Sequence, residues 1–467
     1  MGEHATRRPG HRRDALRRAW EAARAAPPGI LVSVAEEDAI ARAAEGGAGS
    51  APGALTGLPL VVKDNVHALG FACTAATPAL RGFLPPDDAP ALARLRAQGM
   101  VVVGKTNLHE LALGITSTHT AAGVVPNPAL PGRVAGGSSG GTAAAVAAGV
   151  CAHGIGTDTG GSTRIPAAFT GTWGFRPSTG RYPGSGVVSI AYSRDTIGPM
   201  AADLASLRQL DAALAGAPAG ASARPATAGG RSAAPLRLGF DPADVERCEA
   251  GVAAAVRAAL GRLAGARDVE LVEVSFAALD RATAVFEPEL GAQELAPSLA
   301  AYLRSEEGLP GLDGVLAEMA DPHVVRLVEG SLAAVADGVW TPRWHELQND
   351  CARARASYLA VLHRAGLDAV LRPVVPILPP RVDAVLGLDL PERDRLFGVV
   401  TGFARLATVT GAPSLSMPLA GDGAVRSRAG LPGGAPQPSG AGLLLDGIPG
   451  CDEELLALAA RIEDALG

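Results

Sequence analysis

The sequence is poor in cysteine, in charged residues and in long apolar runs. Its 5 cysteines among 467 residues form no CxxC pair, which argues against a disulfide scaffold or a cysteine-based zinc site and fits a cytoplasmic protein. Charged residues make up 19% of the chain and the formal net charge is −6, so we expect no nucleic-acid partner. No uninterrupted apolar run reaches the roughly 18 residues of a membrane span, and no apolar stretch of secretory type follows the basic start.

Apolar residues are plentiful by contrast. They make up 48% of the chain, enough to build a large packed core. The 59 glycines and 36 prolines are close to a fifth of the residues, below the roughly 25–30% that indicates disorder. The length allows about three domains of roughly 150 residues, or one large α/β domain with insertions.

Strand and helix patterns alternate along the chain. Apolar runs at 58–62 and 100–103 predict buried strands, and 88–98 between them predicts a helix. Such alternation is typical of an α/β fold with parallel strands. Further helices are predicted over 14–45 (broken at 27–29), 142–150, most of 245–366 and 451–466. Further strands are predicted at 236–240, 370–378 and 407–419, and a loop is predicted at 421–442.

Two motif matches point to other enzyme classes but fit them poorly. Gly99–Thr106 matches the phosphate-loop pattern GxxxxGK[ST], yet three of its four variable positions are valine, which favours a strand. Gly136–Gly140 matches the GxSxG pattern of α/β-hydrolases, yet the preceding residues 126–135 contain three prolines and make a poor central strand. His109–Glu110 lacks the second histidine of HExxH, because position 113 is leucine, so no metal site is expected.

A third set of motifs is more specific. Lys63 follows an apolar run in VVKDN, Gly136–Gly141 reads GGSSGG, and Gly156–Arg164 reads GTDTGGSTR. Together and in this order they resemble the amidase signature family, and the segments 104–111, 164–168 and 174–178 are similar to its sequences as well. The resemblance is dense over residues 55–215 and looser over 400–466. It implies an α/β fold with a large mixed central β-sheet flanked by helices.

These residue types suit acyl transfer. Serine is a weak nucleophile until a base takes its proton. A lysine can be that base only when it is neutral, which requires burial or a cationic neighbour to lower its pKa from about 10.4. Lys63 follows an apolar strand, where burial is expected. The glycines before Ser162 leave backbone N–H groups open for an oxyanion hole.

The resemblance assigns roles to particular residues. It implies that Ser162 is the nucleophile, Ser138 the bridging serine and Lys63 the base, with a cis peptide bond between Gly137 and Ser138. The N–H groups of the oxyanion hole would belong to Thr159, Gly160 and Gly161. Further residues that hold the loop or touch substrate would be Gly137, Ser139, Asp158 and Arg164. The family needs neither a metal nor a cofactor.

The resemblance also suggests a substrate and leaves alternatives open. The segments 77–83, 192–199 and 444–450 are similar to parts of indoleacetamide and mandelamide hydrolases, which implies an arylacetamide-type small-molecule amide. A secondary-metabolite tailoring or acyl-transferring amidase acting on a larger amide, an amidotransferase subunit and a binding-only homologue remain alternatives. No membrane partner is expected, and a homodimer stays open.

Combined with composition, the resemblance divides the chain into five parts. Residues 1–50 form an N-terminal helical segment and 51–215 the amidase signature core. Residues 216–235 are of low complexity and are expected to be a flexible linker. Residues 236–400 form a helical region that contributes the substrate pocket, and 401–467 return to the core sheet.

Overall fold

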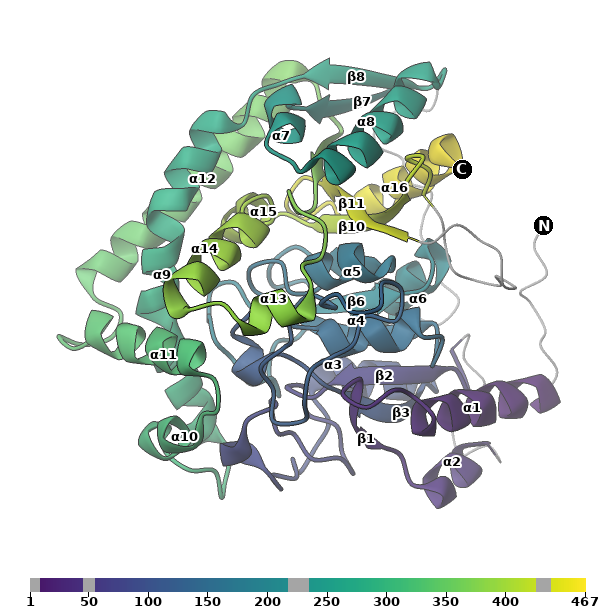
Figure 1. The fold of residues 1–467 in the computed structure, drawn as a ribbon, viewed down its shortest axis with the longest axis vertical. Coiled ribbons are helices and arrows are strands. Elements are labelled where there is room, and N and C mark those ends of the chain that lie inside the picture. Colours follow the sequence, from purple (N-terminus) through teal and green to yellow (C-terminus); the bar gives the residue numbers. More distant parts are fainter. Residues whose placement is uncertain (1–8, 45–54, 217–234, 426–437) are drawn as a thin grey trace.

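A computed structural model describes residues 9–44, 55–216, 235–425 and 438–467 (Figure 1). Within them the strands form one 11-stranded sheet in the order β1-β3-β2-β4-β6-β5-β10-β11-β9-β7-β8. The strands are β1 Leu31–Val34, β2 Pro59–Lys63, β3 Val101–Thr106, β4 His153–Asp158, β5 Trp173–Arg176, β6 Thr196–Ala201, β7 Leu236–Phe240, β8 Val269–Glu273, β9 Ala369–Pro373, β10 Ser414–Ala420 and β11 Pro438–Asp446.

The sheet is mixed. β2 pairs in parallel with β3 and β4, and β7 pairs in parallel with β8 and β9. The central strands from β4 through β6, β5, β10 and β11 to β9 pair antiparallel, as does β1 with β3. The predicted α/β class with a large mixed sheet is therefore confirmed.

Helices cover both faces of this sheet. They are α1 Pro9–Arg24, α2 Glu37–Ala44, α3 Pro90–Ala97, α4 Gly140–Ala147, α5 Arg164–Thr170, α6 Leu204–Leu214, α7 Pro242–Glu246, α8 Ala250–Gly265, α9 Ala277–Ser305, α10 Leu312–Glu318, α11 Pro322–Ala334, α12 Pro342–Ala365, α13 Val382–Leu386, α14 Leu390–Thr401, α15 Arg405–Thr410 and α16 Asp452–Leu466, with short 3-10 helices η1 Pro78–Leu80 and η2 Glu110–Ala112. The helices α9 to α12 form a block along the left side of Figure 1. No helix of the described residues is long and apolar enough to cross a membrane.

Strand β2 shows how the core positions a polar residue. All five of its residues are buried, as expected for a strand covered on both faces. Leu60 and Val62 pack in the cluster of α3 and α6, whereas Val61 packs in the cluster of α1 and α4. Because successive side chains of a strand alternate between faces, Lys63 points to the same face as Val61, towards the start of α4.

Three local predictions were wrong. Residues 31–34, expected within a helix, form β1, since the break at 27–29 ends the helical pattern. The run 407–419 is two elements. Helix α15 ends at Thr410, the following Gly411 has the left-handed φ of 70° that is common at helix ends, and β10 begins at Ser414. Residues 438–442, expected in a loop, belong to β11. Of the expected linker, 217–234 lie outside the described residues, as do 426–437 of the expected loop.

Glycine explains the error in β11. A Cβ at Gly442 would lie 2.9 Å from the Cβ of Ala168 in α5. The glycine therefore lets α5 pack directly on the strand, although glycine is depleted in strands generally. The glycine that suggested a loop at this position instead allows close packing of a helix on the sheet.

Candidate active site

The candidate site lies where β2 and β4 end. The two strands are parallel neighbours, so their carboxyl ends meet at one edge of the sheet, where ligands bind in many α/β proteins. Lys63 is the last residue of β2. Ser162 lies between β4 and α5, and Ser138 lies just before α4. The structure brings these three sequence-predicted residues into one region.

Lys63 is fully buried and has two side-chain partners. Its Nζ donates to Ser138 Oγ at 2.8 Å and to Thr157 Oγ1 at 2.7 Å. Burial lowers the pKa of Lys63 to about 7, although the charges of Asp158 and Asp195 oppose this shift. A large fraction of Lys63 is therefore neutral near pH 7, which a general base requires.

Thr157 was not singled out from the sequence. Its Oγ1 also accepts from Asn65 Nδ2 at 3.2 Å, so two donors fix its position beside Lys63. Thr157 and Ser138 together hold Lys63 Nζ in place. The sequence does carry one local sign of Thr157. In GTDTGG, Thr157 and Thr159 alternate with Asp158, as side chains on opposite faces of a strand do.

The Ser138 loop is built from close backbone contacts. The Gly137–Ser138 peptide bond is cis. A Cβ at Gly137 would lie 2.9 Å from backbone atoms of residues 114–116, so this position requires glycine. Ser139 N donates to Ser162 O at 3.2 Å, and Ser139 Oγ donates to Thr157 O at 3.1 Å. Ser139 thus ties the segments of the two candidate serines to β4.

Asp158 and Arg164 hold the turn that carries Ser162. Both side chains are fully buried, and Arg164 reaches both oxygens of Asp158 at 2.9 and 3.0 Å. Burial alone would raise the pKa of Asp158, but the guanidiniums of Arg164 and Arg176 hold it well below its usual range. Arg164 also donates to Ala404 O at 3.0 Å. Neither side chain is in the wall of the pocket, so their contacts are those of residues that hold the loop.

The expected oxyanion donors differ among themselves. Thr159, Gly160 and Ser162 are partly exposed and line the pocket. Gly161 N donates to Asp158 Oδ1 at 3.0 Å, so its hydrogen is already used. Its φ of 118° and the 2.8 Å that would separate a Cβ from Ile165 Cδ1 show why glycine stands there. In the described residues, Thr159 N and Gly160 N donate to no protein acceptor.

Asp195 is a second residue that the sequence did not single out. It accepts from Thr159 Oγ1 at 2.5 Å, and from the N–H groups of Ile190 and Ala191 at 2.9 and 3.0 Å. Both of those residues line the pocket. One carboxylate therefore joins the Thr159 turn to the pocket wall. The segment 192–199 that contains Asp195 was part of the family resemblance, but the neighbouring sequence does not indicate these hydrogen-bond partners.

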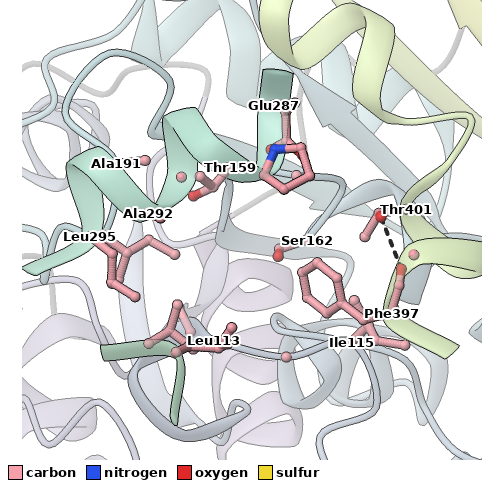
Figure 2. Close-up of a pocket in the computed structure, with 18 of the residues that line it drawn as sticks. Leu113, Ile115, Thr159, Ser162, Ala191, Glu287, Ala292, Leu295, Phe397 and Thr401 are labelled. Carbon is pink, nitrogen blue, oxygen red and sulfur yellow. Dashed lines mark hydrogen bonds between the residues drawn. The ribbon is translucent and has the colours of Figure 1, made fainter. Parts of the chain in front are cut away.

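The pocket in front of Ser162 has a volume of about 470 Å³. Figure 2 shows Ser162 facing the same cavity as Leu113, Ile115 and Phe397. Its wall is largely apolar and includes Leu113, Ile115, Ile190, Leu295, Leu327 and Phe397. Two clusters of polar side chains interrupt it. The first consists of Arg194, Glu287 and Arg405, and the second of His323, Arg326 and Asp394. The helices α9, α11 and α14 supply much of this wall, so the shape of the pocket depends on residues far from the Gly/Ser motifs.

One cluster has the composition of a metal site. Ligand atoms of His109, His119 and Asp321 lie within 4.8 Å of one another. However, Arg393 Nη2 donates to Asp321 Oδ2 at 2.6 Å, and His109 Nε2 lies 3.0 Å from the same oxygen. Burial alone would raise the pKa of Asp321, but the hydrogen bonds from His109 and Arg393 hold it far below its usual range. An arginine cation therefore already occupies this carboxylate, and the cluster is a buried ion-pair network.

The phosphate-loop match is a strand, as expected. Residues 101–106 form β3, and Lys105 is fully buried in an ion pair with Asp64 at 3.1 Å. Lys105 Nζ also donates to Val66 O at 2.8 Å and Ala72 O at 3.1 Å. Its ammonium is consumed by these partners, so it is not placed to bind a phosphate.

Comparison with known proteins gives consistent matches. The family profile described as Amidase matches residues 14–456. The mandelamide hydrolase of Pseudomonas putida is 32% identical over 90% of this chain and 80% of its own length. The indoleacetamide hydrolase of Pseudomonas savastanoi is 32% identical over 93% of this chain and 89% of its own length. Among solved structures, the peptide amidase of Stenotrophomonas maltophilia superposes with a TM-score of 0.78, at 27% identity, over 98% of this chain and 93% of its own.

Proposed function

The chain belongs to the amidase family and is an amidase, and from this premise we propose that it hydrolyses a small arylacetamide-type carboxamide through a Ser162–Ser138–Lys63 triad and an acyl-enzyme. The observation that carries the proposal is the buried, hydrogen-bonded pair of Lys63 and Ser138, at 2.8 Å, next to the Ser162 pocket. The relatives named mandelamide and indoleacetamide hydrolase support the arylacetamide assignment.

The first half of the mechanism moves one proton away from Ser162. Neutral Lys63 accepts a proton from Ser138 Oγ while Ser138 Oγ accepts the proton of Ser162 Oγ. Ser162 Oγ attacks the amide carbonyl, and the carbonyl oxygen becomes an oxyanion. The N–H groups of Thr159 and Gly160 stabilise it, since they face the pocket without another partner.

The second half returns the proton and releases the acid. The Lys63 ammonium reprotonates the relay, which delivers the proton to the amide nitrogen so that ammonia or an amine leaves. The Ser162 ester remains. Water, deprotonated by the same relay, attacks this ester and releases a carboxylic acid. The atoms balance as one amide and one water giving one acid and one amine.

The apolar wall supports an aromatic acyl group. A volume of about 470 Å³ accommodates an aromatic ring on a short methylene arm, and aliphatic side chains and Phe397 surround it. Burial of a ring against such a wall supplies binding energy in proportion to the apolar area. A substrate with its ring bonded directly to the carbonyl would reach less of this wall.

An amide panel tests the proposal. We expect ammonia release from phenylacetamide, mandelamide and indole-3-acetamide with kcat/KM at least about tenfold above benzamide and a long-chain acyl amide. The measurement is ammonia and carboxylate formation under initial-rate conditions. Preference for the long-chain amide, or no turnover of any arylacetamide, would contradict the assignment, and the second outcome would favour a larger amide as substrate.

The pH dependence of the reaction follows from Lys63. Its pKa is lowered to about 7, and only the neutral amine accepts a proton. As pH falls below this value Lys63 becomes charged, so kcat/KM should fall about tenfold per pH unit and level off above it. Initial rates between pH 5 and 9 check this limb. A profile that is flat from pH 5 to 8 would contradict lysine as the base.

We also propose that the enzyme works in the cytoplasm. All five cysteines lie in the described part of the chain and are free thiols. Burial raises the pKa of Cys73 and Cys151 to about 12, so both stay protonated and unreactive. A set of unpaired thiols fits a reducing compartment.

A further inference from the structure

Glu287 of α9 brings a carboxylate to the wall of the otherwise largely apolar pocket, with 21% of its side chain exposed. Its Oε1 accepts from Arg194 Nη1 at 2.5 Å. Its Oε2 lies 3.6 Å from Arg405 Nε, too far for a hydrogen bond. Among the described residues no group makes a hydrogen bond to Oε2, whose one partner is the longer Arg405 ion pair, and Glu287 lines the same cavity as Ser162.

The other carboxylate of the wall and its two threonine hydroxyls are already engaged. Asp394 Oδ1 accepts from His323 Nε2 at 2.9 Å, and its Oδ2 pairs with Arg326 Nη2. The Thr401 hydroxyl donates to Phe397 O at 2.9 Å, and the Thr159 hydroxyl donates to Asp195. Of the two carboxylates in the described wall, Glu287 alone keeps an oxygen for a ligand.

The surroundings of Glu287 restrict what it accepts. Arg194 is 5% exposed and Arg405 is 14% exposed, and their guanidiniums stand on either side of the carboxylate. A cationic substituent would meet two positive charges there, whereas a neutral N–H or O–H would meet only an acceptor. When a ring without a donor fills the pocket, it shields Oε2 from solvent and leaves it only the long Arg405 ion pair, which is costly for a carboxylate oxygen.

We propose that Glu287 selects, through Oε2, an acyl group that carries one neutral hydrogen-bond donor, such as the N–H of an indole ring. This inference rests on the proposed arylacetamide activity and narrows its substrate class. Glu287 is then a specificity-determining residue, and Arg194 fixes the direction in which its free oxygen points.

A pair of nearly isosteric substrates tests the inference on the unmodified protein. Indole-3-acetamide carries the ring N–H, and benzothiophene-3-acetamide has sulfur in its place. We expect kcat/KM to favour the indole by about 10- to 100-fold, because a hydrogen bond to a charged acceptor is lost with the sulfur ring. The ratio is measured from ammonia release with both amides under identical conditions.

The variant Glu287→Gln assigns the preference to Oε2. Arg194 Nη1 holds the carbonyl oxygen of the new amide, so its NH2 group takes the place of Oε2 and faces the indole N–H with a donor. The indole-to-benzothiophene ratio should fall to within about threefold of unity. Asp394→Asn is the matched control, since it neutralises the other carboxylate of the wall, and its ratio should stay close to that of the parent enzyme.

The outcomes separate this inference from the activity on which it rests. Hydrolysis of neither amide would overturn the arylacetamide proposal and the inference with it. Equal hydrolysis of both amides would overturn the inference alone. A large ratio that survives in Glu287→Gln would also overturn it, because another group would then read the ring.

Discussion

Replacing Ser162 with alanine is expected to lower kcat for amide hydrolysis by about 10⁴-fold or more. Ser162 lines the pocket and lies on the turn that Asp158 and Arg164 hold. In the proposed mechanism no acyl-enzyme forms without its Oγ, and Lys63 then has no nucleophile to activate. Steady-state ammonia release from a hydrolysed arylacetamide measures the loss.

Ser193→Ala is a matched control for this variant. Ser193 lies in the segment next to Arg194, and its Oγ is buried without a hydrogen-bond partner. Removing an unpaired hydroxyl costs little, so kcat should stay within about threefold of the parent enzyme. Both variants should melt close to the parent. A Ser162→Ala enzyme that keeps substantial activity would show that the nucleophile is another residue.

Replacing Lys63 with methionine is expected to lower kcat by about 10²- to 10⁴-fold without lowering stability. Methionine keeps the length of the side chain and removes the base. Burial of the amine is unfavourable for its charged form, as the lowered pKa of about 7 shows, so an apolar replacement should leave the melting temperature unchanged or raise it. The acid limb of the pH profile should disappear with the amine.

Lys105→Met is the matched control, because Lys63 and Lys105 are the only two lysines in the sequence. Both side chains are fully buried on neighbouring strands. Lys105 forms a buried ion pair with Asp64 at 3.1 Å, and removing one partner of such a pair costs about 3–5 kcal/mol. We expect Lys105→Met to lose stability and Lys63→Met to lose activity. The reverse pattern, measured by thermal melting and initial rates, would contradict the assignment of the base.

The difference between lysine and arginine explains why position 63 holds a lysine in the proposed mechanism. Apart from nine histidines, the remaining basic side chains are arginines, which stay charged and suit fixed ion pairs such as Arg164 with Asp158. Arginine cannot give up its proton in the physiological range, so it cannot replace Lys63 as a base. Lys63→Arg should therefore be nearly as inactive as Lys63→Met.

The sequence points to the residues of the proposed triad more readily than to the walls of the pocket. Lys63, Ser138 and Ser162 each lie in a short Gly/Ser or KDN motif at the end of an element, and such motifs are visible locally. Thr157 and Asp195 act through hydrogen bonds to residues up to 94 positions away, which no local pattern reveals. Glu287 lies in a helix whose sequence gives no sign that it lines the pocket in front of Ser162.

Local errors in the fold have a similar cause. Strand β1 has only four residues and pairs at the sheet edge with β3, so its short pattern is lost between two helices. In β11 Gly442 serves the packing of α5 rather than a turn. Tertiary contacts override intrinsic preference in both places. The α/β class was predictable because the strands β2 and β3 contain uninterrupted apolar runs and a helical pattern lies between them.

The central claim is that Ser162 carries the acyl group. Its most direct test is to mix the enzyme with p-nitrophenyl phenylacetate, quench in acid within the first turnover and locate the adduct by peptide mass spectrometry. The account predicts a phenylacetyl group on Ser162, formed much more slowly in Lys63→Met and absent in Ser162→Ala. An adduct on another residue, or one that persists at full rate in Ser162→Ala, would contradict it.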